Sequence, residues 1–184
     1  IADVYENLKK TANGEIVSDN SIITFERYIM GSYFEQVLYY ANLRFSKMTG
    51  GRYEIVRGES RDKRISAGLE ISVRDNFNNK ERDISSLSGG ESFQASLALA
   101  LGLSDIIQQR NGGIRLDSIF IDEGFGSLDN DSLASAIETL NDLTGNGNRL
   151  VGIISHISEL KNSIGNKIEV VGTKSGSSIK IITD

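Results

Sequence analysis

The segment Ser118-Ile119-Phe120-Ile121-Asp122-Glu123-Gly124-Phe125-Gly126-Ser127-Leu128-Asp129 decides how the fold of this chain is interpreted. Its first half is a continuous apolar run that ends in two acids, a pattern typical of a central parallel strand covered on both faces. Asp122 and Glu123 are therefore expected at the carboxyl edge of a sheet, where ligands bind in open α/β folds. At that edge Asp122 is suited to hold Mg²⁺, and Glu123 is suited to polarise a water for attack on a phosphate.

Two further candidate segments follow the acids, and the second of them, His156, is predicted to reach the same edge. Ser127, Leu128 and Asp129 follow the acids and come just before a predicted helix, which Asp129 can also simply cap. His156 follows a second apolar strand, residues 151–154, and is the single histidine of the chain. A lone histidine usually has a structural role, but at this position it can reach a phosphate or the attacking water.

A third motif, Leu87-Ser88-Gly89-Gly90-Glu91, precedes a helix predicted over residues 90–109. The two glycines allow backbone amides to approach a ligand closely, and the serine hydroxyl adds a donor. The helix N-terminus adds free N–H groups and its positive dipole end, so the motif can bind a terminal phosphate. The alternative is that Ser88 and the glycines form only a helix cap and a turn.

Around these motifs the pattern predicts an α/β core preceded by an antiparallel β appendage. Thr24 is expected to cap a long helix whose aromatic side chains face the core, with base stacking as the alternative. The predicted helices are 1–12, 25–48, 90–109, 131–143 and 157–164, and the predicted strands lie near 53–55, 69–74, 118–122, 150–155, 167–174 and 178–183. Polar turns are expected at 18–21 and 76–80.

Composition excludes several classes of site. The 184 residues contain no Cys and one His, so disulfides, zinc fingers, cysteine nucleophiles and multi-histidine metal centres are excluded. The length suits one domain, and no apolar run is long enough to cross a membrane. Because the chain begins at Ile1 and shows no signal peptide, we expect a piece of a longer cytoplasmic protein.

The net charge of −5 conceals a basic stretch. Residues 44–64 carry seven basic and three acidic side chains, a local excess of four positive charges. This stretch can face a phosphate backbone or can be an ordinary solvated hairpin face. The residues considered for contact with double-stranded DNA are Arg57, Arg61, Lys63 and Arg64.

The order and spacing of these motifs resemble the second half of an ABC-type ATPase. The signature motif would be Leu87 to Glu91, the Walker B motif Ile119 to Glu123, the D-loop Ser127 to Asp129, and the switch histidine His156. The strings at residues 25–29, 48–53 and 122–129 further resemble the SbcC family of DNA-repair ATPases. That resemblance implies a returning coiled-coil root and turn over residues 1–20 and a C-terminal ATPase lobe over 21–184. It also implies an SbcD-type nuclease partner and a nucleoid-associated role at DNA ends.

The phosphate-binding loop of such ATPases, Gly-x-x-x-x-Gly-Lys-Ser/Thr, is absent from this chain. The resemblance implies that an N-terminal half of the same protein supplies this loop. Asp122, Glu123 and His156 would then act on that ATP with Mg²⁺. Ser88 and Gly90 would contact ATP bound to a second head, which implies a homodimer. We expect the chain alone to be inactive.

Two other classes of protein share part of this pattern. A chromosome-organising or repair ATPase of the SMC or RecN type has the same signature, Walker B and coiled-coil arrangement. A nucleotide-binding subunit of a transporter has its phosphate-binding loop about a hundred residues before the signature. The 86 residues before Leu87 contain no such loop, which argues against a transporter.

Overall fold

The computed structural model describes residues 2–14, 24–58, 69–110, 116–147, 149–173 and 176–183. The elements are α1 (Ala2–Ala12), α2 (Phe25–Met48), β1 (Tyr53–Arg57), β2 (Ile71–Asp75), β3 (Lys80–Asp83), η1 (Ile84–Ser86), α3 (Gly89–Arg110), β4 (Ser118–Asp122), η2 (Phe125–Ser127), α4 (Asn130–Gly147), β5 (Leu150–Ile154), α5 (Ser158–Ser163), β6 (Lys167–Thr173) and β7 (Gly176–Ile182). This order confirms the predicted α/β core with an antiparallel appendage. The turn predicted at 18–21 lies outside the described residues.

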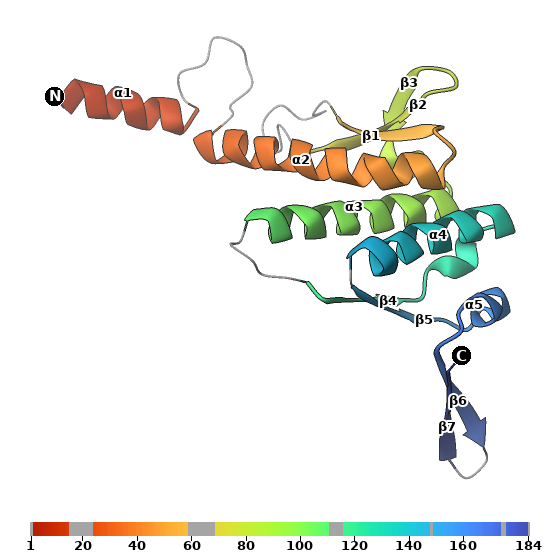
Figure 1. Ribbon diagram of the computed structural model, residues 1–184. Helices are drawn as coiled ribbons and strands as arrows, with labels where there is room; N and C mark the ends of the chain where they lie inside the picture. Colours follow the sequence, from red (N-terminus) through yellow and green to blue (C-terminus); the bar gives the residue numbers. More distant parts are fainter. Residues whose placement is uncertain are drawn as a thin grey trace.

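The elements form layers around a helical centre (Figure 1). The antiparallel sheet β1–β2–β3 lies on one side of α2, and α3 packs along the other side. The helix α4 packs against α2 and β5, and the parallel pair β4–β5 lies beyond the helices in this view. The β6–β7 hairpin projects from the end of this stack, whereas α1 extends away from the start of α2.

The long helix α2 begins as predicted but buries fewer aromatic side chains than predicted. The Thr24 hydroxyl oxygen accepts a hydrogen bond from the Arg27 backbone N–H and caps the helix. Phe45 is fully buried in the second half of the helix, but Phe25 and Tyr33 in the first half are exposed. The prediction of an aromatic core face is therefore wrong for those first turns, which extend past the end of α3 in Figure 1.

A glycine sets the close approach of α2 and α3. A Cβ atom added at Gly102 of α3 would lie 2.7 Å from both the Val37 carbonyl oxygen and the Ala41 backbone nitrogen. Only a residue without a side chain allows this contact. The two helices are thereby held backbone to backbone, which fixes the direction in which α3 runs to its N-terminus at the predicted phosphate motif.

Within the described part of the chain, the parallel pair β4–β5 is covered on one face only. Ile119 and Val151 are half-buried against the core, but Phe120 is 70% exposed and Ile154 is 56% exposed. The prediction that these strands are covered on both faces is therefore wrong for this chain. The physical reason is that α4 packs against β5 and that α3 and α4 lie on the same side of the pair.

The β6–β7 hairpin also exposes apolar side chains. Ile168 pairs with Ile181 and Val170 pairs with Ile179 across the two strands. All four are between 68% and 70% exposed, so the hairpin presents an apolar face to solvent. Among the described residues, none of the helices combines the length and the apolar composition needed to span a membrane.

Candidate functional site

The two acids of the Walker B segment lie at the carboxyl end of β4, as predicted. Asp122 ends the strand and pairs in register with Ile154 of β5. The next backbone N–H, that of Glu123, donates to the Ile154 carbonyl oxygen at 2.9 Å. His156 comes two residues after Ile154, and its Nδ1 lies 3.0 Å from both Glu123 carboxylate oxygens. The structure therefore brings Glu123 and His156 together at the sheet edge, beside Asp122 at the end of β4.

The contact between Glu123 and His156 determines which ring nitrogen carries a hydrogen. An ionised carboxylate only accepts hydrogen bonds, so the Nδ1 atom that faces it must be the donor. The His156 side chain is 82% exposed and that of Glu123 is 47% exposed. Both groups are thus held by each other and remain accessible to a ligand at the edge of the sheet.

The signature segment forms a reciprocal cap at the start of α3. The Ser88 hydroxyl oxygen accepts from the Glu91 backbone N–H at 3.3 Å, and the Glu91 carboxylate accepts from the Ser88 N–H at 2.9 Å. This is the capping box expected for Ser and Glu at this spacing. The Ser88 hydroxyl still has its own hydrogen to donate, so the cap and a phosphate contact are compatible.

Sequence reasoning missed the groups that hold Glu91 from the other side. Burial alone would raise the pKa of the Glu91 carboxyl, but hydrogen bonds from Ser88 and from the Tyr53 hydroxyl lower it below its ordinary value. Burial and this carboxylate together raise the pKa of Tyr53. Arg82 donates to the Tyr53 hydroxyl at 3.1 Å, and Arg52 lies over its ring. Tyr53 alternates with polar residues in the sequence and so resembled an ordinary buried strand position.

The segment predicted to be a D-loop, Ser127 to Asp129, contacts the start of the predicted signature helix α3. Leu128 is half-buried against the core, and the Ser127 hydroxyl donates to the Gly124 carbonyl oxygen at 3.1 Å. A Cβ atom added at Gly90 would lie 2.8 Å from the Ser127 carbonyl oxygen. The signature helix therefore needs glycine at this position because its backbone contacts the D-loop backbone.

Asp129 caps the helix that follows the D-loop. Its carboxylate accepts from the Ser132 backbone N–H at 2.8 Å at the start of α4. This hydrogen bond lowers the pKa of Asp129 below its ordinary value. Within this chain Asp129 therefore acts as a helix cap, as the sequence allowed.

The donor set at the sheet edge suits Mg²⁺ better than a metal that needs a full protein cage. Among the residues that the structure describes, no group of three or more metal-ligating side chains comes together. Mg²⁺ is commonly held by one or two carboxylates together with waters and substrate phosphates. The exposed carboxylate of Asp122 at the end of β4 fits that requirement.

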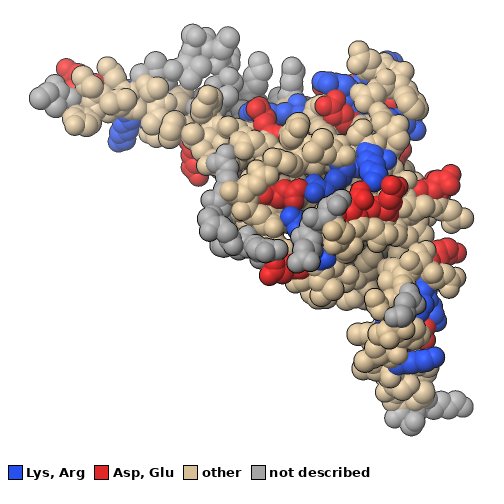
Figure 2. All heavy atoms as spheres, viewed as in Figure 1, with Lys and Arg blue, Asp and Glu red and all other residues tan. Residues whose placement is uncertain are grey.

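The described members of the basic stretch are paired with acids. Arg57 forms an ion pair with Glu35 at 2.9 Å, and Arg44 forms one with Asp105 at 2.7 Å. Lys47 contacts two carboxylates of α4. On the face seen in Figure 2, blue and red side chains lie beside one another. Three of the predicted DNA contacts lie outside the described residues: Arg61, Lys63 and Arg64.

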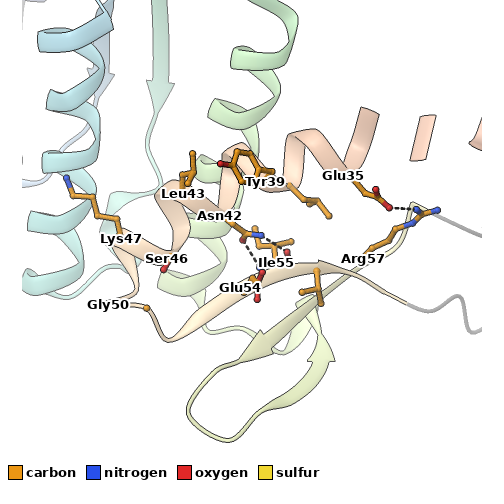
Figure 3. Close-up of a pocket in the computed structure, with 13 residues that line it drawn as sticks. Glu35, Tyr39, Asn42, Leu43, Ser46, Lys47, Gly50, Glu54, Ile55 and Arg57 are labelled. Atoms are coloured by element: carbon orange, nitrogen blue, oxygen red, sulfur yellow. Dashed lines mark hydrogen bonds and ion pairs between the residues drawn. The ribbon is translucent and has the colours of Figure 1, made fainter. Parts of the chain in front are cut away.

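A separate groove runs between α2 and β1 (Figure 3). In this groove Asn42 of α2 binds the backbone of β1. Its side-chain amide donates to the Ile55 carbonyl oxygen at 2.7 Å and accepts from the Ile55 N–H at 2.8 Å. The ion pair of Glu35 and Arg57 stands at one end. Of the predicted site residues that the structure describes, only Arg57 lines this groove, so the groove is not the predicted phosphate site.

The fold and the ordered motifs define the C-terminal lobe of an ABC-type ATPase head. Solved head domains of SMC ATPases have the same fold. One, described in work on ATP-driven dimerization and DNA-stimulated activation of SMC ATPases, has a TM-score of 0.65 at 14% identity and covers 85% of this chain and 89% of its own. The Smc head domain from Pyrococcus furiosus, bound to the C-terminal domain of ScpA, has a TM-score of 0.62 at 17% identity, covering 85% of this chain and 37% of its own.

Within that class the resemblance is to the SbcC family, and the expectation drawn from the sequence is confirmed. The family model described as SbcC/RAD50-like, Walker B motif, matches residues 59–142. The nuclease SbcCD C subunit of Vibrio cholerae serotype O1 is 48% identical over 98% of this chain. The protein of the same name from Staphylococcus aureus strain JH9 is 54% identical over 85% of this chain. The chain spans 18% and 16% of the length of these two relatives.

Proposed function

We propose that this chain is the C-terminal lobe of an SbcC-like ATPase subunit and supplies half of a composite ATP site. The observation that carries the proposal is the 3.0 Å contact between Glu123 and His156 at the carboxyl end of the parallel pair β4–β5. The 48% identity with a nuclease SbcCD C subunit over 98% of the chain supports the same assignment.

The chemistry follows from the groups at this edge. Asp122 would hold Mg²⁺, which would neutralise charge on the phosphates. Glu123 would accept a hydrogen bond from the attacking water and orient it toward the γ-phosphorus, while the bond to ADP breaks in line. The Nδ1–H of His156 would hold the Glu123 carboxylate in place, and its exposed ring would face the γ-phosphate.

An N-terminal lobe would complete this half-site. The chain has no phosphate-binding loop, and the backbone amides and lysine of that loop provide most nucleotide contacts in such sites. The exposed apolar side chains of Phe120 and Ile154 give that lobe a surface to cover, because parallel strands are normally covered on both faces. The first helix, α1, would be the root of a returning coiled coil within residues 1–20, since Val4, Tyr5 and Leu8 on it are exposed.

A second head would bring ATP to the signature motif. Ser88→Arg in the complete subunit is expected to abolish ATP-dependent dimerisation, because a bulky cation would occupy the γ-phosphate position across the interface. ATP binding to each protomer should stay nearly unchanged. Equilibrium sedimentation with and without ATP measures this, and Ser96→Arg on the exposed side of the same helix is the control. An unchanged dimer fraction in Ser88→Arg would contradict the assignment of the signature motif to the opposite protomer.

The ATP cycle would gate the processing of DNA ends by an SbcD-type nuclease. The alternative is an SMC- or RecN-type head without a nuclease, and the likeness of this chain to SMC heads at 14–17% identity supports the fold alone. Capture with the complete subunit distinguishes them. A nuclease among the retained proteins supports the SbcC-like function, whereas a kleisin-type partner contradicts it.

The proposal includes DNA contact by the segment 57–64, in which Arg57 is also paired with Glu35. Reversing charge with Lys63→Glu and Arg64→Glu should weaken duplex binding and flatten its salt dependence, since fewer counterions are released. Unchanged affinity and salt slope would leave the segment as a solvated face.

A further inference from the structure

In the second turn of the signature helix, Phe93 packs against Gly124, the residue that follows the predicted catalytic acid Glu123. Phe93 lies one helical turn after Gly90, and a Cβ atom added at Gly124 would lie only 2.3 Å from its ring atom Cε2. The same ring meets the fully buried Phe125 edge to face, with centroids 4.8 Å apart and planes at 62°. The first two turns of α3 thus contact both ends of the segment from Gly124 to Ser127.

The backbone under this ring is held in an unfavourable conformation. Glu123 has φ of 58°, in the left-handed region that costs a residue with a side chain about 1–2 kcal/mol. Gly124 continues the turn with φ of 97°. Such a conformation persists only where the surroundings impose it. On one side the Glu123 N–H is bound to Ile154 at 2.9 Å, and on the other side the Phe93 ring covers Gly124.

We propose that Phe93 is a positioning residue that links the signature helix to the carboxylate of Glu123. The ring contacts no reacting atom. It holds the turn at Gly124, and that turn directs the Glu123 side chain to its 3.0 Å contact with His156. A shift of the signature helix, which in the proposed dimer follows contact with the partner's ATP, would therefore move the catalytic carboxylate of the same chain. This inference rests on the proposed function.

The contact predicts a selective loss of turnover in the complete ATPase subunit. Phe93→Ala should lower kcat by about 10- to 100-fold, the usual result of displacing a catalytic group by a fraction of an ångström to one ångström. The KM for ATP and the ATP-dependent dimer fraction should stay within about threefold of wild type, because no nucleotide contact is removed. Gly124→Ala alters the same contact at its other residue. It should likewise lower kcat and leave the KM for ATP and the dimer fraction nearly unchanged. Leu99→Ala, on the same helix and also packed against the core, is the control for packing loss alone.

A double variant tests whether the effect passes through the carboxylate. In the Glu123→Gln background, Phe93→Ala should lower the residual rate by less than about twofold, because residues acting as a unit are not additive. A wild-type kcat in both Phe93→Ala and Gly124→Ala would overturn the inference, as would equal losses in Leu99→Ala. A wild-type subunit without ATPase activity would instead contradict the proposed function itself.

Discussion

The signature–D-loop region has its contacts satisfied within this chain, whereas the β4–β5 sheet leaves apolar side chains exposed. At the signature motif, Ser88 and Glu91 satisfy each other's backbone N–H groups, and Gly90 rests on the Ser127 carbonyl. At the sheet, Phe120 is 70% exposed, and none of the described helices covers its ring. The chain therefore builds the geometry of its chemical groups but leaves the surface beside them open, which is expected for one half of a composite site.

The difference separates two kinds of effect. Changes at the signature, the D-loop or the Walker B acids should alter function with the partner lobe already in place. Changes on the open face should alter association with that lobe and leave the chain's own stability almost unchanged. The following predictions test this division.

The largest effect is expected at the Walker B acids. In the complete subunit, Glu123→Gln should keep Mg-dependent ATP binding and slow hydrolysis by about 10²–10⁴-fold, because the amide keeps the size of the side chain but loses the charge that orients water. Steady-state ATPase rates and nucleotide binding on the same preparation measure this. Hydrolysis at the wild-type rate would show that Glu123 is not the catalytic carboxylate.

The open face should respond differently from the covered face of the same strand. Phe120→Ala should change the free energy of unfolding of the chain by less than about 1 kcal/mol, because the ring is already exposed. It should weaken association with the N-terminal lobe by about 1.5–3 kcal/mol, the value of burying a Phe side chain. Ile119→Ala, half-buried against the core, is the matched control and should lower stability instead. Association that is insensitive to Phe120→Ala would mean that the lobe does not cover this face.

The smallest effect concerns the charge of Glu91. Its folded-state pKa is lowered below the ordinary value of 4.5, so the unfolded chain binds the proton first as the pH falls. The stability that this carboxylate contributes is therefore complete above the unfolded pKa and is lost as the pH falls through the folded pKa. Glu91→Gln keeps an oxygen for the Ser88 N–H but does not titrate. Denaturant unfolding of both proteins should show a stability difference that shrinks with acid; a pH-independent difference would contradict the charged cap.

Sequence alone predicted the elements whose signals are local. The apolar run Ile119–Ile121 with its terminal acids predicted β4, and Thr24 predicted the start of α2, because strand patterning and capping depend on neighbouring residues. Strand β3 was missed because its four residues, Lys80 to Asp83, are all charged or polar. Cross-strand contacts hold it, among them the 2.7 Å ion pair of Arg74 and Glu81.

The remaining errors concern contacts between distant residues. Periodicity showed that Phe120 lies on a strand but not whether the chain itself covers both faces of that strand. Likewise, Phe93 fits an ordinary helix position, and only the fold places its ring on Gly124. Tyr53 fits an apolar strand position in the same way, although its hydroxyl contributes to holding Glu91.

The central claim, that this chain is half of an ATP site, is tested most directly by titrating ATP with Mg²⁺ into the folded 184-residue chain in a calorimeter. Circular dichroism verifies that the preparation is folded. We predict no measurable binding alone, and Mg-dependent binding once the N-terminal half is added as a separate polypeptide. ATPase activity should then rise more steeply than linearly with protein concentration, because the working site needs two heads. Micromolar ATP binding by the isolated chain would contradict the account.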